Sequence, residues 1–236
     1  MKRLFATIVI VFAFVQSTFA TWSIIIVDPK THEIGIAGAS CTQNVYGIGS
    51  IVPNKGAIIV QAMSNYNAHD VGRKAIISGY SPEEIITVLK QERFDPQHQQ
   101  YAIVTLKDMQ VKTFTGDACY AFNGSITGKG ISVQGNVLAN ENVLKAVYEA
   151  VRKGQNDELS LSEVLMIAME AGSQAGGDKR CDTIQTASSA FIVVAKPEDA
   201  PEKPYIKIVV KGIPKGGENA ITALRREYDS WKKENK

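Results

Sequence analysis

Short apolar runs occur in pairs along this chain, and a tight turn separates the members of a pair. The first pair, Trp22–Val27 and Glu33–Ala39, flanks an Asp-Pro-Lys-Thr sequence that is typical of a turn. Adjacent strands joined by tight turns favour antiparallel sheets. The other runs that predict strands are Ala57–Ala62, Tyr101–Leu106, Val111–Thr115, Ile131–Gln134, Ala187–Ala195 and Tyr205–Val210.

Amphipathic helices are predicted between these pairs. Ser81, followed by Pro82 and by Glu84 three residues on, has the pattern of a helix start with a capping box. Strand pairs alternating with separate groups of helices predict a single α+β domain over residues 21–236, in which helices cover two antiparallel sheets. A strand and a surface helix complete it from about residue 197. The predicted helices are His69–Ser78, Ile85–Gln91, Asn142–Lys153, a run from Ser160 or Ser162 through Ala171, and Ala220–Lys233.

The first twenty residues have the three parts of an export signal. Lys2 and Arg3 precede an apolar stretch, Leu4–Val15, and a more polar stretch ends in the small residue Ala20. The apolar stretch is too short to span a bilayer as a helix, which needs about 20 residues. We therefore expect cleavage after Ala20, a secreted or periplasmic protein without a membrane anchor, and Thr21 as the first mature residue.

Composition narrows the classes of partner. Without Lys2 and Arg3, the 26 basic side chains fall to 24, which equals the number of acidic ones and argues against nucleic acid as a partner. The three cysteines, Cys41, Cys119 and Cys181, match no zinc pattern, and the sequence predicts no metal and no cofactor. In an exported protein they favour one disulfide and one free thiol.

An N-terminal threonine carries a nucleophile and a base on one residue. The α-amine titrates near 7.7–8 in model compounds, so at neutral pH part of it can accept the hydroxyl proton. The chain has three histidines and neither a G-x-S-x-G nor an H-E-x-x-H motif that would offer another catalytic centre. Signal peptidases accept many residues after the cut, however, so the cleavage site alone does not make Thr21 catalytic.

Several segments resemble, in order and spacing, a widespread and poorly characterised family related to the N-terminal-nucleophile hydrolases. Some of its members are labelled fimbrial or pilin-like. The resemblance covers Thr21 to Ala195, and its Cys-bearing form is similar to the exported branch of the family. The segments that carry it are Thr21–Pro29, Glu33–Ser40, Thr115-Gly116, Gln134–Ala139, Ala175–Cys181 and Ser188–Val194.

This resemblance implies a four-layer αββα sandwich with the nucleophile at the start of the first strand. The chain departs from the family at two places near the expected site. Phe114 stands where many members carry His before Thr-Gly, and Gln99-Gln100 replaces an Arg-Gln pair. These departures bear on the substrate more than on the nucleophile.

Three residues are candidate partners of Thr21. Asn136 is a candidate oxyanion donor, although a turn Asn can instead bond its own backbone. Ser40 is a candidate for orienting the Thr21 amine, or else it caps a loop. Asp178 is a candidate anchor for the α-ammonium or a substrate cation, or else it lies in a solvated loop. If the segments of Ser40 and Asp178 converge, a Cys41–Cys181 disulfide would tie them together.

The leading hypothesis is an exported amidohydrolase that cleaves a small peptide or an acylated amino acid through a Thr21 acyl-enzyme. The competing hypothesis is a secreted binding or surface-assembly module, pilin-like and non-catalytic, on the same fold. The partner would be a small-molecule or peptide substrate. The sequence leaves the oligomeric state open, a homo-oligomer included.

Overall fold

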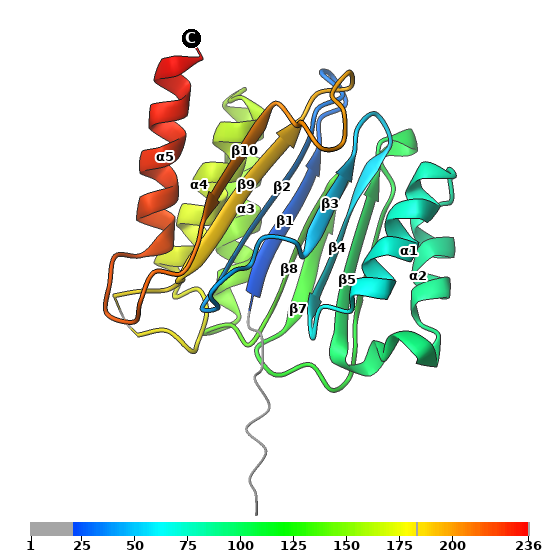
Figure 1. The fold of residues 1–236 in the computed structure, drawn as a ribbon, viewed down its shortest axis with the longest axis horizontal. Coiled ribbons are helices and arrows are strands. Elements are labelled where there is room, and N and C mark those ends of the chain that lie inside the picture. The colour runs from blue at the N-terminus through cyan, green and yellow to red at the C-terminus, as the bar shows by residue number, and fades with distance from the viewer. Residues whose placement is uncertain (1–20, 183, 236) are drawn as a thin grey trace, which may run out of the picture.

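Two antiparallel sheets form the centre of the molecule (Figure 1). The structure, a computed structural model, describes residues 21–182 and 184–235, and the predicted export segment lies outside them. The four-stranded sheet has the order β3 (Gly49–Val52), β4 (Gly56–Ala62), β5 (Gln99–Thr105) and β6 (Val111–Thr115). The six-stranded sheet has the order β10 (Ile206–Val210), β9 (Ser189–Ala195), β2 (Ile34–Ser40), β1 (Thr21–Val27), β8 (Ile131–Asn136) and β7 (Gly124–Gly128).

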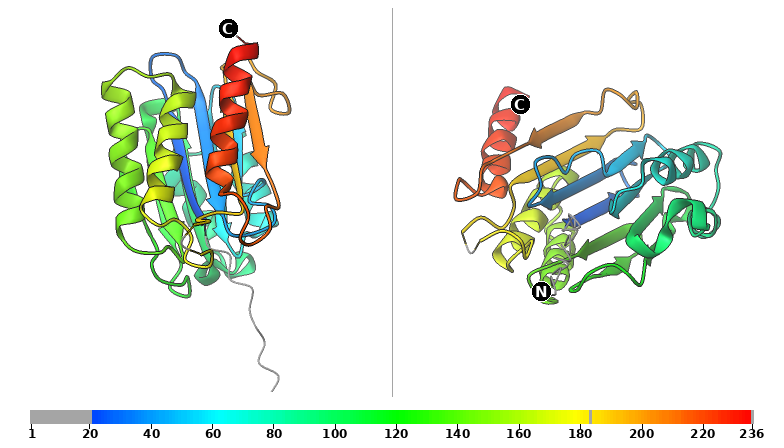
Figure 2. Two further views of the ribbon diagram at one scale, coloured as in Figure 1. Left: turned by 90° about the vertical axis from the view of Figure 1, so that its left-hand side faces the viewer. Right: turned by 60° about the horizontal axis from the view of Figure 1, so that its bottom comes forward.

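Helices gather against each sheet. Helices α1 (Tyr66–Ile77) and α2 (Pro82–Leu89) contact β4, β5 and β6. Helices α3 (Asn142–Asn156), α4 (Leu161–Gln174) and α5 (Ala220–Glu234) lie side by side against the six-stranded sheet (Figure 2). Short 3₁₀ turns lie at Glu92–Phe94, Pro96–His98 and Lys107–Met109.

The alternation of side chains along β1 explains why it lies at the centre. Trp22, Ile24 and Ile26 are fully buried in the apolar cluster shared with α3 and α4. Ile25 and Val27 point the other way, into a cluster that also takes side chains from β4 and β5. Successive strand residues point to opposite faces, so a strand that is apolar on both faces is covered on both. A third cluster fills the space between β4, β5 and the helices α1 and α2.

Most predicted elements are confirmed, with ends shifted by a few residues. β1 and β2 form the predicted hairpin, with Trp22 opposite Ala39. Ser81 caps α2, and Glu84 completes the capping box. The predictions missed β3 and β7 because β3 is only four residues long and β7 is a half-exposed Gly-Ser-Ile-Thr-Gly strand with little apolar content.

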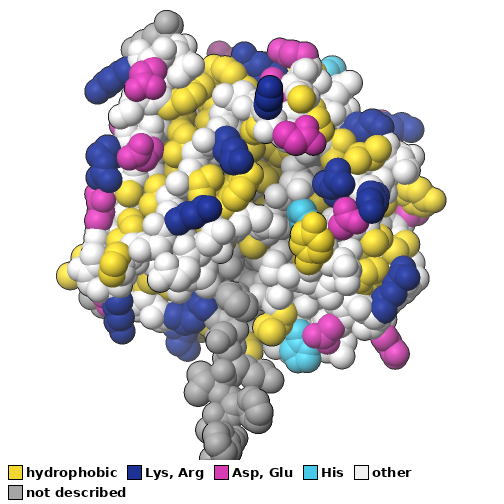
Figure 3. Space-filling view, in the orientation of Figure 1, with side chains coloured by type: hydrophobic (Ala, Val, Ile, Leu, Met, Phe, Trp, Pro, Cys, Tyr) yellow, Lys and Arg dark blue, Asp and Glu magenta, His cyan; other side chains and the backbone are white. Residues whose placement is uncertain are grey.

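The described surface is mixed in charge. Basic and acidic side chains are interspersed on the face shown in Figure 3. Within residues 21–182 and 184–235, no helix has the length and apolarity needed to cross a bilayer.

Candidate active site

Thr21 opens the strand at the middle of the six-stranded sheet. Both neighbours of β1 run antiparallel to it, so its first residue meets the last residues of β2 and β8. Thr21 pairs directly with Asn136, and Trp22 pairs with Ala39, which brings Ser40 to the same edge. Thr21 is 3% exposed, while Ser40 and Asn136 are fully buried. Thr21, Ser40 and Asn136, three of the four predicted site residues, therefore lie side by side where the inner strands β1, β2 and β8 of the six-stranded sheet begin or end.

Polar side chains fill the space between the two sheets near this edge. Ser23 follows Thr21 on the inward face of β1, and Ser132 and Gln134 precede Asn136 on the same face of β8. Gln61 on β4 and Gln100 on β5 face them from the other sheet. All five of these residues are at most 1% exposed. Buried polar groups need partners, and these residues provide them for one another.

The five residues and Asn136 form one connected chain of hydrogen bonds. The Ser132 hydroxyl donates to Gln134 Oε1 at 2.6 Å, and Gln134 Nε2 donates to Ser23 Oγ at 2.7 Å. Ser23 in turn donates to Gln61 Oε1 at 2.6 Å, and Gln61 Nε2 donates to Gln100 Oε1 at 2.7 Å. Asn136 Nδ2 reaches the same oxygen of Gln100 at 3.2 Å.

Gln100 is the branch point of this chain. Its Nε2 donates to Thr115 Oγ1 and to the carbonyl oxygens of Gly124 and Gly135 at 2.9–3.1 Å. Its side-chain oxygen, Oε1, accepts from Gln61 Nε2 and Asn136 Nδ2, so both the oxygen and the nitrogen of the side-chain amide are used. A connected network of buried hydrogen bonds restricts the orientation of its members. The side-chain amide of Asn136 is thereby fixed beside Thr21.

The residue after Asn136 has a strained backbone. Val137 adopts φ 50°, a left-handed conformation that is an outlier for a β-branched residue and costs about 1–3 kcal/mol. Its N–H donates to the Tyr120 carbonyl, and its carbonyl accepts from the Lys179 N–H, both at 3.1 Å. These bonds hold the turn that ends β8, which is the turn that presents Asn136.

Asp178 lies on the adjoining loop with a fully buried carboxylate. One oxygen accepts from the Cys41 N–H at 2.6 Å, and both oxygens accept from the Arg180 guanidinium at 2.7–3.1 Å. Arg180 Nη2 also donates to Ser40 Oγ at 3.2 Å. A buried charge is tolerated when it is paired and hydrogen-bonded in this way. The loop of Asp178 and the end of β2 therefore converge, and Asp178 reaches Ser40 through Arg180.

A disulfide joins the same two segments. Cys41 and Cys181 are bridged, with their Cα atoms 5.7 Å apart, across 140 residues of sequence. Cys119 is free and buried, and burial raises the pKa of its thiol. The prediction of one bridge and one free thiol is confirmed, and so is the pairing of Cys41 with Cys181.

A pocket of about 340 Å³ opens beside Thr21 and Ser40. The ends of β2 and β4 and the segment after β2 form its walls. Its lining residues are Thr21, Ser40, Thr42, Asn44, Val45, Tyr46, Gly47, Ile48, Gln61, Ala62, Met63 and Ser64.

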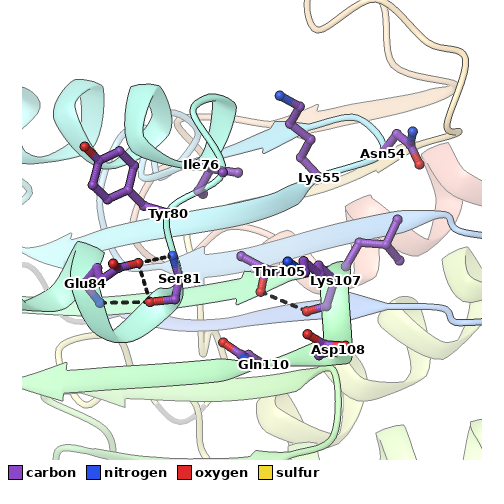
Figure 4. A pocket seen from close by; sticks show the side chains of 12 residues that line it. Asn54, Lys55, Ile76, Tyr80, Ser81, Glu84, Thr105, Lys107, Asp108 and Gln110 are labelled. Carbon is purple, nitrogen blue, oxygen red and sulfur yellow. Dashed lines mark hydrogen bonds between the residues drawn. The ribbon is translucent and has the colours of Figure 1, made fainter.

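A larger pocket of about 540 Å³ lies at the far end of the molecule, around Tyr80, Ser81 and Lys107 (Figure 4). Its polar groups serve local structure. Ser81 and Glu84 cap helix α2, and Lys55 Nζ donates to the Ile77 carbonyl. Its size alone does not make it the better candidate, because the Ser81 hydroxyl and the Glu84 carboxylate that line it are engaged in the capping box of α2.

We looked for a metal site among side chains that can act as ligands. Within residues 21–182 and 184–235, no three His, Cys, Asp or Glu side chains are grouped so that they could hold a metal ion.

The sequence interpretation missed Gln61, Gln100 and Gln134 as site components. A signal was present, because each is a polar residue within a run that predicts a strand. In the resemblance Gln100 stands as the unchanged member of the Gln99-Gln100 pair, which assigns it no role in the site.

Comparison with known proteins gives a family and a fold. A crystal structure of the protein SPO2555 from Silicibacter pomeroyi, assigned to DUF1028, superimposes with a TM-score of 0.75 at 24% identity, and covers 89% of this chain and 88% of the other. At that identity the likeness establishes the fold alone. No curated protein sequence matches the chain. Residues 21–216 match the family described as a family of unknown function, DUF1028, and the chain belongs to this family.

Proposed function

We propose that this protein is an exported amidohydrolase whose nucleophile is the hydroxyl of Thr21, exposed as the N-terminal residue by removal of residues 1–20. The observation that carries the proposal is the convergence of Thr21, Ser40 and Asn136 at one end of the inner strands of the six-stranded sheet, beside a pocket. Two sheets packed through an apolar cluster, with helices against each, are compatible with the four-layer αββα sandwich of N-terminal-nucleophile hydrolases. The family match also begins at residue 21.

The proposed reaction begins at the free amine. The Thr21 α-amine takes the hydroxyl proton, directly or through a water molecule, and the oxygen attacks the amide carbonyl carbon. Asn136 Nδ2, held by Gln100, donates to the oxygen that becomes negative. The carbon–nitrogen bond then breaks, the leaving amine takes the proton from the α-ammonium, and water hydrolyses the Thr21 ester.

Ser40 and Asp178 support this arrangement in the proposal. The Ser40 hydroxyl lies next to Thr21 at the strand ends and orients the amine. Asp178 holds Arg180 and the Cys41 N–H, and Arg180 holds Ser40, so the role of Asp178 is to position that group. The disulfide keeps the two segments together.

Before cleavage the same residue is inert in this scheme. The nitrogen of Thr21 is then part of a peptide bond and cannot act as a base. One proteolytic cut would thus both release the protein and activate it.

The test begins with the N-terminus of the exported protein. Mass spectrometry is expected to show a chain starting at Thr21. An electrophilic amide-mimicking probe, such as a β-lactone, is expected to label this mature protein. It should label neither the Thr21→Ala variant nor a precursor that retains residues 1–20.

Two outcomes would contradict the proposal. A mature chain that begins at another residue removes the nucleophile, and labelling that persists in Thr21→Ala moves the chemistry elsewhere. A folded mature chain that begins at Thr21 but reacts with no probe would favour the second candidate, a secreted binding or surface-assembly module.

A further inference from the structure

One disulfide joins the segment of Ser40 to the segment of Arg180. Cys41 directly follows Ser40, and Cys181 directly follows Arg180. One residue before the bridge on each side, Arg180 Nη2 donates to Ser40 Oγ at 3.2 Å. The covalent bond and this hydrogen bond therefore hold the same junction, which lies next to Thr21 where β1 begins and β2 ends.

Each segment is also anchored on its own side of the junction. The end of β2 pairs with β9, and the Ser40 carbonyl accepts from the Ser188 N–H at 2.9 Å. On the other side, the Lys179 N–H donates to the Val137 carbonyl at 3.1 Å. Opening the bridge is therefore expected to leave both segments folded and to act on the contacts between them.

The hydrogen bonds that cross the junction are partly open to water. From the side of β2, the Cys41 N–H donates to the buried Asp178 carboxylate at 2.6 Å. From the other side, Arg180 reaches Ser40 while both oxygens of Asp178 hold its guanidinium. The Arg180 side chain is 26% exposed, so water competes for these bonds. Segments held in this way open locally at low cost in free energy, and a covalent link between them suppresses the opening.

The bridge is more accessible to a small reductant than the third cysteine is. Cys41 and Cys181 are both half-buried. Cys119 is buried, and its thiol donates to the Gln99 carbonyl at 3.4 Å. Exposed disulfides are more often labile and regulatory than buried ones, because an attacking thiolate must reach one of the two sulfur atoms. A dithiol reagent therefore reaches the bridge before it reaches the free thiol.

We propose that this disulfide is a redox-sensitive switch for the site around Thr21. A dithiol reductant attacks the bridge, its own two thiols become a disulfide, and Cys41 and Cys181 take up two electrons and two protons as free thiols. The junction then opens, Arg180 leaves Ser40, and acylation of Thr21 slows. The opening rests on the junction alone, whereas the slower acylation rests on the proposed function.

Hydrogen exchange tests the junction without catalysis. Mature protein with the bridge formed is compared with the same protein after reduction by dithiothreitol. The Cys41 amide, whose bond to Asp178 crosses the junction, is expected to exchange at least about tenfold faster after reduction. The Lys179 and Ser188 amides are matched controls, because each bonds a carbonyl on its own side of the junction and should keep its exchange rate.

The rate of probe labelling tests the effect on the site. The β-lactone is added after the reductant is removed, and modification of Thr21 is read from the mass of its peptide, so that labelled cysteines are not counted. Reduction is expected to slow acylation of Thr21 at least about tenfold, and reoxidation to restore it, because a displaced positioning group is costly for catalysis. Circular dichroism should show that the reduced protein stays folded; global unfolding would make the bridge a structural one and overturn the switch.

Two cysteine variants complete the test. The double variant Cys41→Ser, Cys181→Ser cannot form the bridge and should react slowly with or without dithiothreitol. Cys119→Ser keeps the bridge and should respond to reduction as the wild type does. The inference is overturned if the Cys41 amide exchanges equally in both redox states, if the reduced protein is acylated as fast as the oxidised one, or if Cys119→Ser abolishes the response.

Failure here is distinguishable from failure of the proposed function. Faster exchange of the Cys41 amide on reduction, in a chain that no electrophilic probe labels, would keep the redox-sensitive junction and remove the nucleophile. Labelling of Thr21 at one rate in both redox states, with unchanged exchange, would keep the nucleophile and remove the switch.

Discussion

The space between the two sheets is filled differently at its two ends. At the end farther from Thr21, the inward side chains of β1, β2, β4 and β5 include Ile25, Ile36, Ile59 and Val104, all buried in one apolar cluster. At the Thr21 end, the same faces of the same strands carry Ser23, Ser40, Gln61 and Gln100. Each of these four strands therefore changes from apolar to polar along a single face.

This difference separates two physical tasks. Apolar burial supplies most of the free energy of folding, and it has no directional requirement. A buried hydrogen-bond network contributes less per group but fixes orientation, and an unpaired member is costly. The far end therefore stabilises the sheet pair, whereas the Thr21 end holds side chains in defined positions beside the pocket.

The largest loss of stability is expected from a substitution in the apolar end. Ile25→Ala removes a fully buried side chain and is expected to lower the free energy of unfolding by about 2–5 kcal/mol. Urea denaturation measures this loss, and the rate of probe labelling below the unfolding midpoint should change less than about twofold. A large fall in labelling with little loss of stability would reverse the assignment of the two ends.

Asn136→Ala tests the polar end. Loss of one oxyanion donor is expected to raise the barrier by about 2.7–4 kcal/mol, a fall of about 10²–10³ in the rate of acylation. Stopped-flow labelling of the mature protein measures the rate, with circular dichroism as the control for folding. A rate within about threefold of the wild type would remove Asn136 from the site.

Ser23→Ala changes the polar neighbour of Ile25 on the same face of β1, and its effect on stability can be compared with that of Ile25→Ala. The change leaves Gln61 Oε1 and Gln134 Nε2 without their shared partner and is expected to cost about 1–3 kcal/mol of stability. Thermal or urea unfolding measures it. A cost below about 0.5 kcal/mol would mean that the network is not held together through Ser23.

Lowering the pH should change the free energy of unfolding less than any of these substitutions. The network consists of Ser, Gln, Asn and Thr residues, so its contribution should not depend on pH near neutrality. His69 on α1, with Nε2 3.1 Å from Ser50 Oγ, has a pKa that burial, and then Arg73, lower from its ordinary value. The unfolded chain therefore takes up this proton first as pH falls.

The stability linked to His69 is complete above about pH 6.5 and is lost as pH falls toward the lower pKa of the folded state. Urea unfolding at several pH values should show this loss, and His69→Gln should reduce it. An unchanged acid dependence in His69→Gln would assign the loss to other groups.

Much of the local structure could be predicted from the sequence because its signals are local. The turn between β1 and β2, the alternation of β1, and the Ser81 cap all lie within a few residues of the structure they specify. The strands β3 and β7 were missed for the same reason, since their short or glycine-rich segments carry little pattern of their own. Thr21 could be proposed from the predicted cleavage site and the chemistry of an N-terminal threonine. Ser40, Asn136 and Asp178 could be proposed from their places at strand ends and in a polar loop, within segments that resemble the family.

The sequence by itself determined the strand pairs, the helix starts, the neutral charge of residues 21–236 and the expectation that Thr21 opens the first strand. Only the tertiary structure decided that Gln61, Gln100 and Gln134 meet Ser23 between the sheets, and that Cys41 pairs with Cys181. These contacts join residues 38–140 positions apart, and they depend on how antiparallel strands pair and sheets pack. Side-chain patterns fix which face of a strand is buried, but pairing fixes which buried residues become neighbours.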